Sequence, residues 1–287
     1  MVSVRALVAA SAAIMISTTA FAADLGLPPP PYQYAPPAPV VESGGWYLRG
    51  DLGVGVQTFS QFDVGPASAV PATWTVNQKD IQDATIFGAG IGYEVNNWLR
   101  FDVTGEYRTE AMFHALGSYT GATCNGGGGG ICFDNFGGGF SSAVFMANAY
   151  IDLGTWWCIT PYIGGGVGGA FNRIAGVQDL GPLPPGTVGF GYTNSDSASW
   201  NLAWNVQAGL TYNVSNSFKV DFSWRYLNLG SPQSANIFCQ NTGATGSCDF
   251  FNLKDITSQD FRIGFRWMLL PTPAPVVMPQ PPLMSRG

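Results

Sequence analysis

The stretch from Ser199 to Val214, SWNLAWNVQAGLTYNV, alternates between apolar and polar residues over its whole length. Alternate side chains of a β-strand point to opposite faces of a sheet, so this stretch predicts a strand with one apolar and one polar face. Aromatic residues stand near both ends of the apolar face and aliphatic residues stand between them, which is typical of a strand that faces lipid. The polar face carries amides and small residues in place of the Lys and Glu of a water-exposed sheet. The pattern therefore favours a strand that lines the inside of a narrow barrel.

The composition limits the chain to a membrane protein without spanning helices. Charged residues make up 10% of the 287 residues, against roughly 25% in ordinary soluble domains. Past the N-terminus, Gly, Asn, Thr and charged residues interrupt every run of about 20 apolar residues that a spanning helix would need. A closed β-barrel is the other structure that satisfies every backbone N–H and C=O group in hydrocarbon. The net charge of −6 provides no basic stripe for phosphates, which argues against nucleic acid as a partner.

The two ends of the chain differ from its centre. Residues 1–22 combine Arg5, an apolar stretch and the small-x-small sequence Ala20-Phe21-Ala22, which predicts a cleaved signal peptide, with a short membrane anchor as the alternative. Residues 23–44 are proline-rich and predict an extended periplasmic segment, either a spacer with cell-wall contact or a disordered leader. A second proline-rich tail spans residues 271–287. The barrel is expected between them, over residues 45–270.

Eight segments in this central region share the alternation, although the fourth carries apolar residues on both faces. They are Trp46–Val56, Thr85–Val95, Trp98–Arg108, Phe140–Leu153, Tyr162–Phe171, Ser199–Val214, Phe218–Leu229 and Ile256–Leu269. Short connections at 96–97, 154–160 and 215–217 alternate with long ones at 57–84, 111–139, 173–198 and 230–254. The sequence therefore predicts an all-β fold, an eight-stranded antiparallel up-and-down transmembrane β-barrel with short periplasmic turns and four long outer loops.

Aromatic residues gather at the short-turn end of these segments and predict a girdle at the periplasmic membrane interface. The girdle residues are Trp46, Trp98, Trp156, Tyr212, Phe218 and Trp267.

The inward faces carry seven basic and seven acidic residues. Eight strands enclose a space that side chains just fill, and a buried charge without a partner is costly. We therefore expect a network of ion pairs that closes the lumen, with a charge-lined conduit for small solutes as the alternative. The network residues are Arg49, Asp51, Glu94, Arg100, Asp102, Glu106, Arg108, Asp152, Lys219, Asp221, Arg225, Asp260, Arg262 and Arg266.

The long loops are acidic. Such a rim would bind divalent cations near lipid headgroups, or cationic ligands, or would only keep exposed loops soluble. Its aspartates are Asp63, Asp80, Asp83, Asp134, Asp179, Asp196, Asp249 and Asp255, set against Lys79, Arg173 and Lys254.

Four cysteines are disulfide candidates in an oxidising compartment. Cys124 and Cys132 lie in one long loop and Cys239 and Cys248 in another, so pairing within each loop is expected, with a metal site as the alternative. Cys158 lies in a short turn and is expected to be a free thiol or an intermolecular link.

No catalytic motif emerges from the sequence. His114 is the one histidine, and no Ser-His-acid arrangement can be assembled around it. The glycines at 126–130 are not followed by the Lys and Ser/Thr of a phosphate-binding loop. We expect no enzyme activity, no catalytic or cofactor-binding residues, no cofactor and no metal site.

Several motifs resemble the small outer-membrane β-barrel proteins of alphaproteobacteria, often grouped as porin-family or opacity-type surface proteins. The motifs are the leader AFAADL, the opening strand GWYLRGDLGVG, the turn ANAYIDLGTWW, the strand PYIGGGVG and the closing FRIGFRWML. The resemblance covers about residues 45–270 and implies an eight-stranded barrel with roles in envelope integrity, host contact or, in some members, haem binding. It assigns none of these roles to particular residues. Unlike many outer-membrane barrels, this chain continues beyond its last aromatic strand.

Together these patterns predict a protein of the bacterial outer membrane with a structural and surface-interaction role and a plugged lumen. The alternatives are a narrow porin-like channel, a surface adhesin or haem-type ligand binder acting through the long loops, and a soluble secreted β-sandwich adhesin. The expected partners are outer-membrane lipid and lipopolysaccharide, peptidoglycan or a periplasmic protein at the proline-rich ends, and a host or small-molecule ligand at the loops.

Overall fold

A computed structural model describes residues 44–65, 71–121, 128–182, 188–240 and 247–269. All of them belong to one compact unit, Val41–Pro275. The predicted signal peptide, residues 23–43 of the first proline-rich segment and the C-terminal tail lie outside the described residues. Within the described ranges, no helix is both long and apolar enough to cross a membrane.

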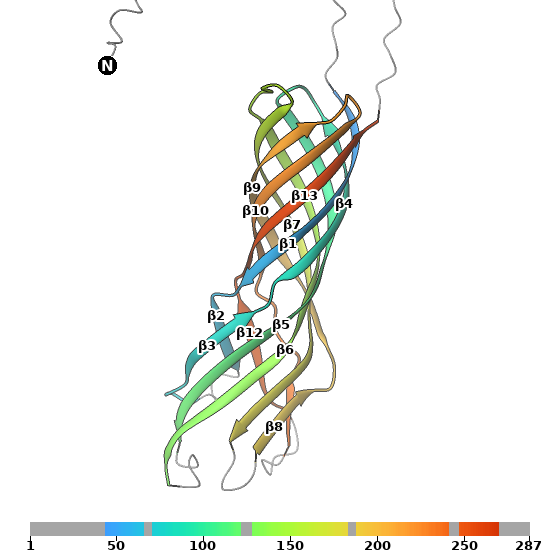
Figure 1. Cartoon of the computed structure of the whole chain (residues 1–287). Helices are drawn as coiled ribbons and strands as arrows, with labels where there is room; N and C mark the ends of the chain where they lie inside the picture. Colours follow the sequence, from blue (N-terminus) through green and yellow to red (C-terminus); the bar gives the residue numbers. More distant parts are fainter. Residues whose placement is uncertain (1–43, 66–70, 122–127, 183–187, 241–246, 270–287) are drawn as a thin grey trace, which may run out of the picture. The chain divides into compact units, whose positions relative to one another are not determined.

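Eight strands form a closed antiparallel ring in which each strand pairs with two neighbours (Figure 1). In ring order they are β1 (Gly45–Thr58), β4 (Ala84–Glu94), β5 (Leu99–Gly121), β6 (Gly130–Asp152), β7 (Ile159–Pro182), β9 (Ser197–Asn213), β10 (Phe218–Gly230) and β13 (Ile256–Met268). The β7–β9 and β1–β13 pairings close the ring. The predicted eight-stranded barrel is confirmed, and its closure leaves no unpaired strand edge to face hydrocarbon.

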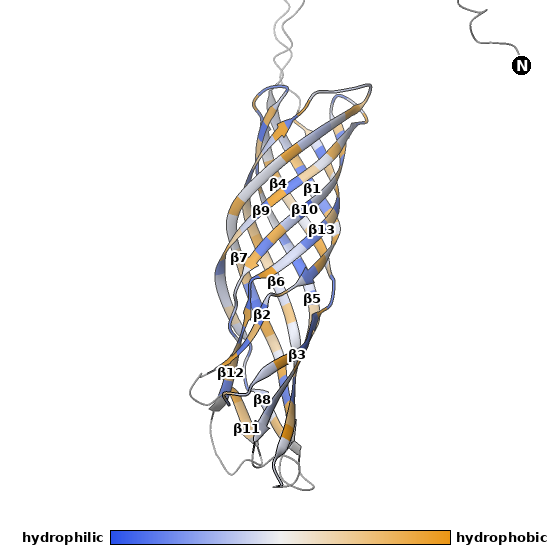
Figure 2. Cartoon of the chain, turned by 90° about the vertical axis from the view of Figure 1, so that its left-hand side faces the viewer, coloured by the Kyte–Doolittle hydropathy of each residue, from blue (hydrophilic) through white to orange (hydrophobic). Residues whose placement is uncertain are grey.

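The two faces of the ring strands carry opposite chemistry. Trp200 and Leu202 of β9 are 62% and 72% exposed on the outside, whereas Arg100 of β5 and Arg262 of β13 are 0% and 5% exposed on the inside. Hydrophobic and hydrophilic residues accordingly alternate along the strands in Figure 2. A water-soluble β-sandwich would bury its indoles and expose its arginines, so that alternative is wrong.

Side chains close two of the short turns. After β4, Asn96 Oδ1 accepts hydrogen bonds from the backbone N–H groups of Trp98 and Leu99 at 3.0 and 2.9 Å. After β9, Ser215 Oγ accepts one from the Phe218 N–H at 3.0 Å. Asn and Ser favour turns because their short side chains replace a missing backbone partner in this way.

Beyond the ring, five further strands form where the sequence predicted only long loops. They are β2 (Gln61–Gly65), β3 (Thr75–Ile81), β8 (Val188–Thr193), β11 (Ile237–Gln240) and β12 (Ser247–Lys254). β3 pairs with β5, β8 with β7 and β11, and β12 with β11 and β2. The four long connections are present as predicted, and the structure adds strands within them that the sequence did not indicate.

The length of the central strands explains this difference. β5, β6 and β7 contain 23, 23 and 24 residues, whereas about 9–11 residues of a tilted strand cross a bilayer. Their far ends must therefore project beyond the membrane, where they offer a backbone template on which the five short strands pair. We call this part the outer extension: β2, β3, β8, β11 and β12 with residues 111–121, 130–139 and 175–182.

Candidate functional site: the barrel interior

The fourteen charged residues predicted to line the lumen all take part in ion pairs no longer than 4.0 Å inside the ring. Most of these side chains are no more than 3% exposed; Glu94, Asp152 and Lys219, at the short-turn end, are the exceptions at 16%, 12% and 20%. The buried ion pairs expected from the sequence are thus present. Every strand of the ring except β7 and β9 contributes at least one charge to them.

The most deeply buried cluster joins strands β5, β10 and β13. Arg225 contacts Asp260 at 2.5 Å and Glu106 at 2.6 Å, and Arg108 contacts Asp260 at 2.9 Å. Ser258 Oγ also donates to Asp260 at 2.6 Å. Two guanidinium groups and two carboxylates share these charge-assisted bonds, so no charge in the cluster lacks an opposite neighbour.

A second cluster links β1, β5 and β6. Arg49 contacts Asp51 at 2.7 Å and Asp102 at 2.6 Å. Tyr150 accepts a hydrogen bond from Arg49 Nη1 at 2.8 Å, and the Tyr47 hydroxyl donates to Asp102 at 3.1 Å. This network crosses the lumen between strands far apart in the sequence.

A third cluster lies nearer the short turns. Arg266 contacts Asp221 at 2.7 Å and Glu94 at 2.9 Å, and Lys219 contacts Glu94 at 2.8 Å. Thr211 of β9 completes it by donating to Asp221 at 2.5 Å.

Arg100 is held mainly by aromatic rings. Its guanidinium lies 4.0 Å from the ring centroid of Tyr150 and 4.5 Å from that of Tyr162, and its Nε donates to Asp152 at 3.1 Å. Cation–π attraction of this kind strengthens when water is excluded. Glycine makes the space for one of these rings, since a Cβ atom at Gly164 would lie 2.6 Å from Tyr150 Cδ1.

An apolar cluster fills the interior between the charged clusters and the outer extension and continues through the extension. It was not predicted from the sequence, although the apolar residues on both faces of Phe140–Leu153 were its signal. Its buried members are Phe59, Phe62, Ile81, Ala84, Ala111, Phe113, Ala115, Phe136, Phe140, Val144, Met146, Ala170, Ile174, Val177, Ala203, Leu227, Leu229, Ile237, Phe251, Leu253 and Ile256. The Phe62 and Phe251 rings stack at 4.9 Å between centroids, so the cluster packs like the core of a soluble domain.

Comparison with known proteins agrees with this geometry. The family model described as an outer membrane protein beta-barrel domain matches residues 8–268. The chain belongs to this family.

The relatives and solved structures that match the chain do so at low sequence identity. An uncharacterized protein of Brucella abortus is 28% identical over 254 residues, which cover 80% of this chain and 86% of the relative. Outer membrane protein PagN of Salmonella typhimurium is 35% identical over 88 residues, which cover 30% of this chain and 34% of PagN. Among solved structures, OprG from Pseudomonas aeruginosa aligns with a TM-score of 0.44 at 13% identity, covering 79% of this chain and 97% of OprG. Neisserial surface protein A aligns with a TM-score of 0.43 at 16% identity, covering 79% of this chain and 99% of that protein.

The predicted girdle of this outer-membrane barrel stands at its short-turn end. Trp46, Trp98, Trp156, Tyr212 and Trp267 are exposed on the outside. Phe218 is half-buried because its ring packs against Phe265 and Trp267, with centroids 6.2 and 5.9 Å apart. The position of these rings at a lipid interface stays a prediction.

The predicted disulfides of the barrel are visible only in part. Cys132 and Cys239 are disulfide-bonded. Cys124 lies outside the described residues, as does the side chain of Cys248, so the pairing within each loop stays a prediction. Cys158 is exposed and free. His114 is exposed on β5.

The acidic rim is not uniform. Asp63, Asp80, Asp83, Asp196 and Asp255 are exposed, as expected of a solvated loop. Asp179 is only 6% exposed, and Asp134 and Asp249 are half-buried. The expectation that Asp179 is exposed is therefore wrong, because this residue lies on an extension strand beside an apolar interior, whereas Asp134 and Asp249 are exposed in part.

Proposed function

We propose that this outer-membrane barrel is a closed envelope protein that stabilises the membrane and presents its outer extension to partners, rather than a channel. The observation that carries the proposal is the filling of the barrel interior at two levels. The ion-pair clusters occupy the interior from the short turns up to the level of Asp260, and the apolar cluster occupies the interior beyond that level, toward the extension.

A narrow channel is the main rival. It would need a continuous wet path, in which charged side chains are free to exchange partners with the passing solute. Here Arg108, Arg225 and Asp260 are 0–1% exposed and are tied to one another across three strands. Beyond them lie the apolar side chains of the cluster, which offer no hydrogen bond to a solute or to water. The buried polar side chains Ser142 and Asn172 at this level bond to each other, and Asn172 also donates to the Leu229 carbonyl. Single-channel conductance tests this rival directly.

The outer extension supports the surface-interaction part of the proposal. Ile131 and Phe133 of β6 are 63% and 52% exposed, and Leu180 of neighbouring β7 is 42% exposed. These residues face outward on the strand ends that project beyond the about ten residues needed to cross a bilayer. Exposed apolar groups outside the membrane favour contact with a partner, either a host surface or a small apolar ligand.

The outer surface of the ring and the two proline-rich ends indicate further partners. The exposed apolar belt of the ring suits lipid and lipopolysaccharide acyl chains. The proline-rich ends suit contact with peptidoglycan or a periplasmic protein, because extended proline-rich chains act as spacers.

A deletion strain tests both halves of the proposal. We expect loss of the protein to increase sensitivity to detergent, and wild-type protein to restore resistance. A variant with Ile131→Ser and Phe133→Ser should restore detergent resistance. The same variant should no longer bind host cells to which the wild-type strain binds. Unchanged detergent sensitivity after deletion would overturn the structural role, and unchanged surface binding by the double variant would overturn the interaction role.

A further inference from the structure

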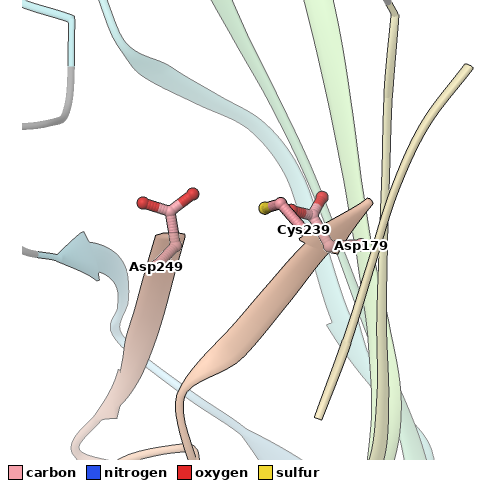
Figure 3. A group of neighbouring side chains, drawn as sticks. All are labelled: Asp179, Cys239 and Asp249. Carbon is pink, nitrogen blue, oxygen red and sulfur yellow. The ribbon is translucent and has the colours of Figure 1, made fainter. Parts of the chain in front are cut away.

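Three aspartates meet inside the outer extension, far from the lumen ion pairs. Asp179 of β7 lies opposite Gly191 of β8, and Gly191 in turn lies opposite Cys239 of β11. Asp249 of β12 follows on the next strand, and Asp134 comes from β6 on the other side of Asp179. Figure 3 shows the Asp179 and Asp249 carboxylates with the Cys239 sulfur between their strands.

The Asp179 and Asp249 carboxylates are close to each other. One ligand atom each from Asp179, Cys239 and Asp249 all lie within 4.8 Å of one another. The Asp134 and Asp179 side chains are also close enough to interact. Glycine allows this approach, since a Cβ atom at Gly181 would lie 2.8 Å from Asp134 Oδ1.

Buried oxygen atoms in this group lack partners. Asp179 is 6% exposed, and its Oδ1 atom has no hydrogen-bond donor among the described residues. Asp134 Oδ1 is likewise buried without a donor. A carboxylate oxygen is costly to bury unless a hydrogen bond or a cation satisfies it.

In the part of the chain that the structure describes, no basic side chain balances the three carboxyl groups. No ion pair there joins Asp134, Asp179 or Asp249 to a Lys, Arg or His. The segments that join the extension strands here, residues 122–127, 183–187 and 241–246, contain no Lys, Arg or His in their sequence. The compensating charge must therefore come from outside the protein, as a proton or a metal ion.

We propose that Asp179 and Asp249, with Asp134 beside Asp179, bind one divalent cation of the calcium type. Calcium takes oxygen ligands at about 2.3–2.6 Å, so two ligands on opposite sides of one ion stand about 5 Å apart. This matches the Asp179 and Asp249 oxygens, which lie within 4.8 Å of each other. The Cys239 sulfur is in a disulfide and offers no thiolate, so the donor set consists of hard oxygens. The bound ion would join β6, β7 and β12 at the end of the extension.

The competing explanation is a shared proton. A carboxyl pair that shares one proton also removes the repulsion between its members, as in coupled carboxylate pairs. A calcium site binds one metal ion per chain, whereas a shared proton requires none. A direct measurement of metal binding therefore distinguishes the two explanations.

The test uses the full mature chain refolded in non-ionic detergent without lipopolysaccharide, whose phosphates would bind the same ions. The probe is terbium(III), a calcium substitute whose luminescence is excited through a nearby aromatic ring. Tyr119 is suitable because it lies within the field of the three aspartates: burial raises its pKa most, and the charges of Asp134, Asp179 and Asp249 raise it further. Displacement of terbium by calcium chloride then gives the calcium affinity, and calorimetry gives the stoichiometry.

The variants are Asp179→Asn and Asp249→Asn, with Asp63→Asn as the matched control on an exposed β2 position. We expect one calcium ion per chain in the wild type and the control, and at least tenfold weaker binding in the other two variants. Equal binding by all four proteins, or no saturable binding by the wild type, would overturn the proposal. The shared proton would then be the remaining explanation for the buried carboxyl groups. If Asp179→Asn does not refold, the half-buried Asp249→Asn decides the question alone. The site is independent of the proposed function, because conductance does not depend on whether the extension holds an ion.

Discussion

Arg225 and Asp260 stand directly opposite each other on β10 and β13, and Arg225 Nε donates to Asp260 Oδ2 at 2.8 Å. Asp260 is also the partner of Arg108, at 2.9 Å from β5. One carboxylate thus bridges two buried guanidinium groups, and Glu106, which contacts both, supplies the second negative charge. The interior of the barrel is organised around such shared charges rather than around isolated pairs.

Asp260→Asn should therefore destabilise the barrel strongly. The substitution keeps the shape of the side chain but leaves Arg108 and Arg225 with one carboxylate fewer, and removal of one partner from a buried pair costs about 3–5 kcal/mol. The free energy of unfolding in urea, followed by tryptophan fluorescence in detergent or lipid vesicles, measures the loss. Asp196→Asn is the control, since the Asp196–Arg173 pair is exposed and its removal should change stability little. Similar losses in both variants would contradict this reading of the interior.

Val206→Arg should destabilise the barrel through lipid exposure. Val206 is 47% exposed near the centre of β9, about six residues from the girdle residue Tyr212, and an arginine at the bilayer midplane costs about 2–4 kcal/mol. Val214→Arg is the matched control, because Val214 is 53% exposed just past the end of the same strand. Near the interface the same substitution should cost about 0–1 kcal/mol. Unfolding in vesicles gives both values, and equal costs at the two positions would refute the membrane placement.

The extension should lose stability as the pH rises, when no divalent cation is present. Burial, with Asp134 and Asp249 facing it from β6 and β12, raises the pKa of Asp179 from the ordinary 3.8 to about 9. The folded state then holds a proton that the unfolded state releases above 3.8, so this contribution is complete below that pH and is lost as the pH rises toward 9. Unfolding of the wild type and of Asp179→Asn at pH 6 and pH 9, in metal-free buffer, isolates the effect. The wild type should lose more stability than the variant over this interval; an equal loss would show that Asp179 does not carry the proton.

We expect two disulfides, each within one loop, and one free cysteine. Proteolytic digestion without reduction, followed by mass spectrometry, should recover the pairs Cys124–Cys132 and Cys239–Cys248. Cys158 is free and exposed, so a maleimide should label it in the folded protein without reductant. A Cys132–Cys239 peptide would instead show that the loops are cross-linked to each other.

The ring could be predicted because a strand between lipid and a polar interior needs apolar and polar residues in simple alternation. Trp200, Leu202 and Trp204 point to one solvent, Asn205 and Gln207 point to another, and closure follows from the need to pair every backbone group. The charged residues of the lumen could be named for the same reason, since an apolar outer face leaves them only the interior. Their partners could not be named, because Arg49 and Asp102, which pair at 2.6 Å, are 53 residues apart.

The outer extension could not be predicted from the alternation alone. Its strands are short, and segments such as the glycines at 137–139 of β6 carry no strong strand preference. They form because β5, β6 and β7 continue beyond the membrane and supply hydrogen-bonding partners. Phe136 and Phe251 then pack against each other inside the extension, although both lie in segments that the sequence predicted to be solvated loops. The buried Asp179 was misplaced for the same reason.

Conductance in a planar lipid bilayer tests the central claim, that the lumen is closed, most directly. The refolded full-length mature protein should add no current steps above the background of the bilayer at moderate voltage, while a general porin reconstituted in the same way should give clear steps. Reproducible steps from the wild-type protein that scale with salt concentration would contradict the account, because ions would then cross between side chains that the structure holds in contact.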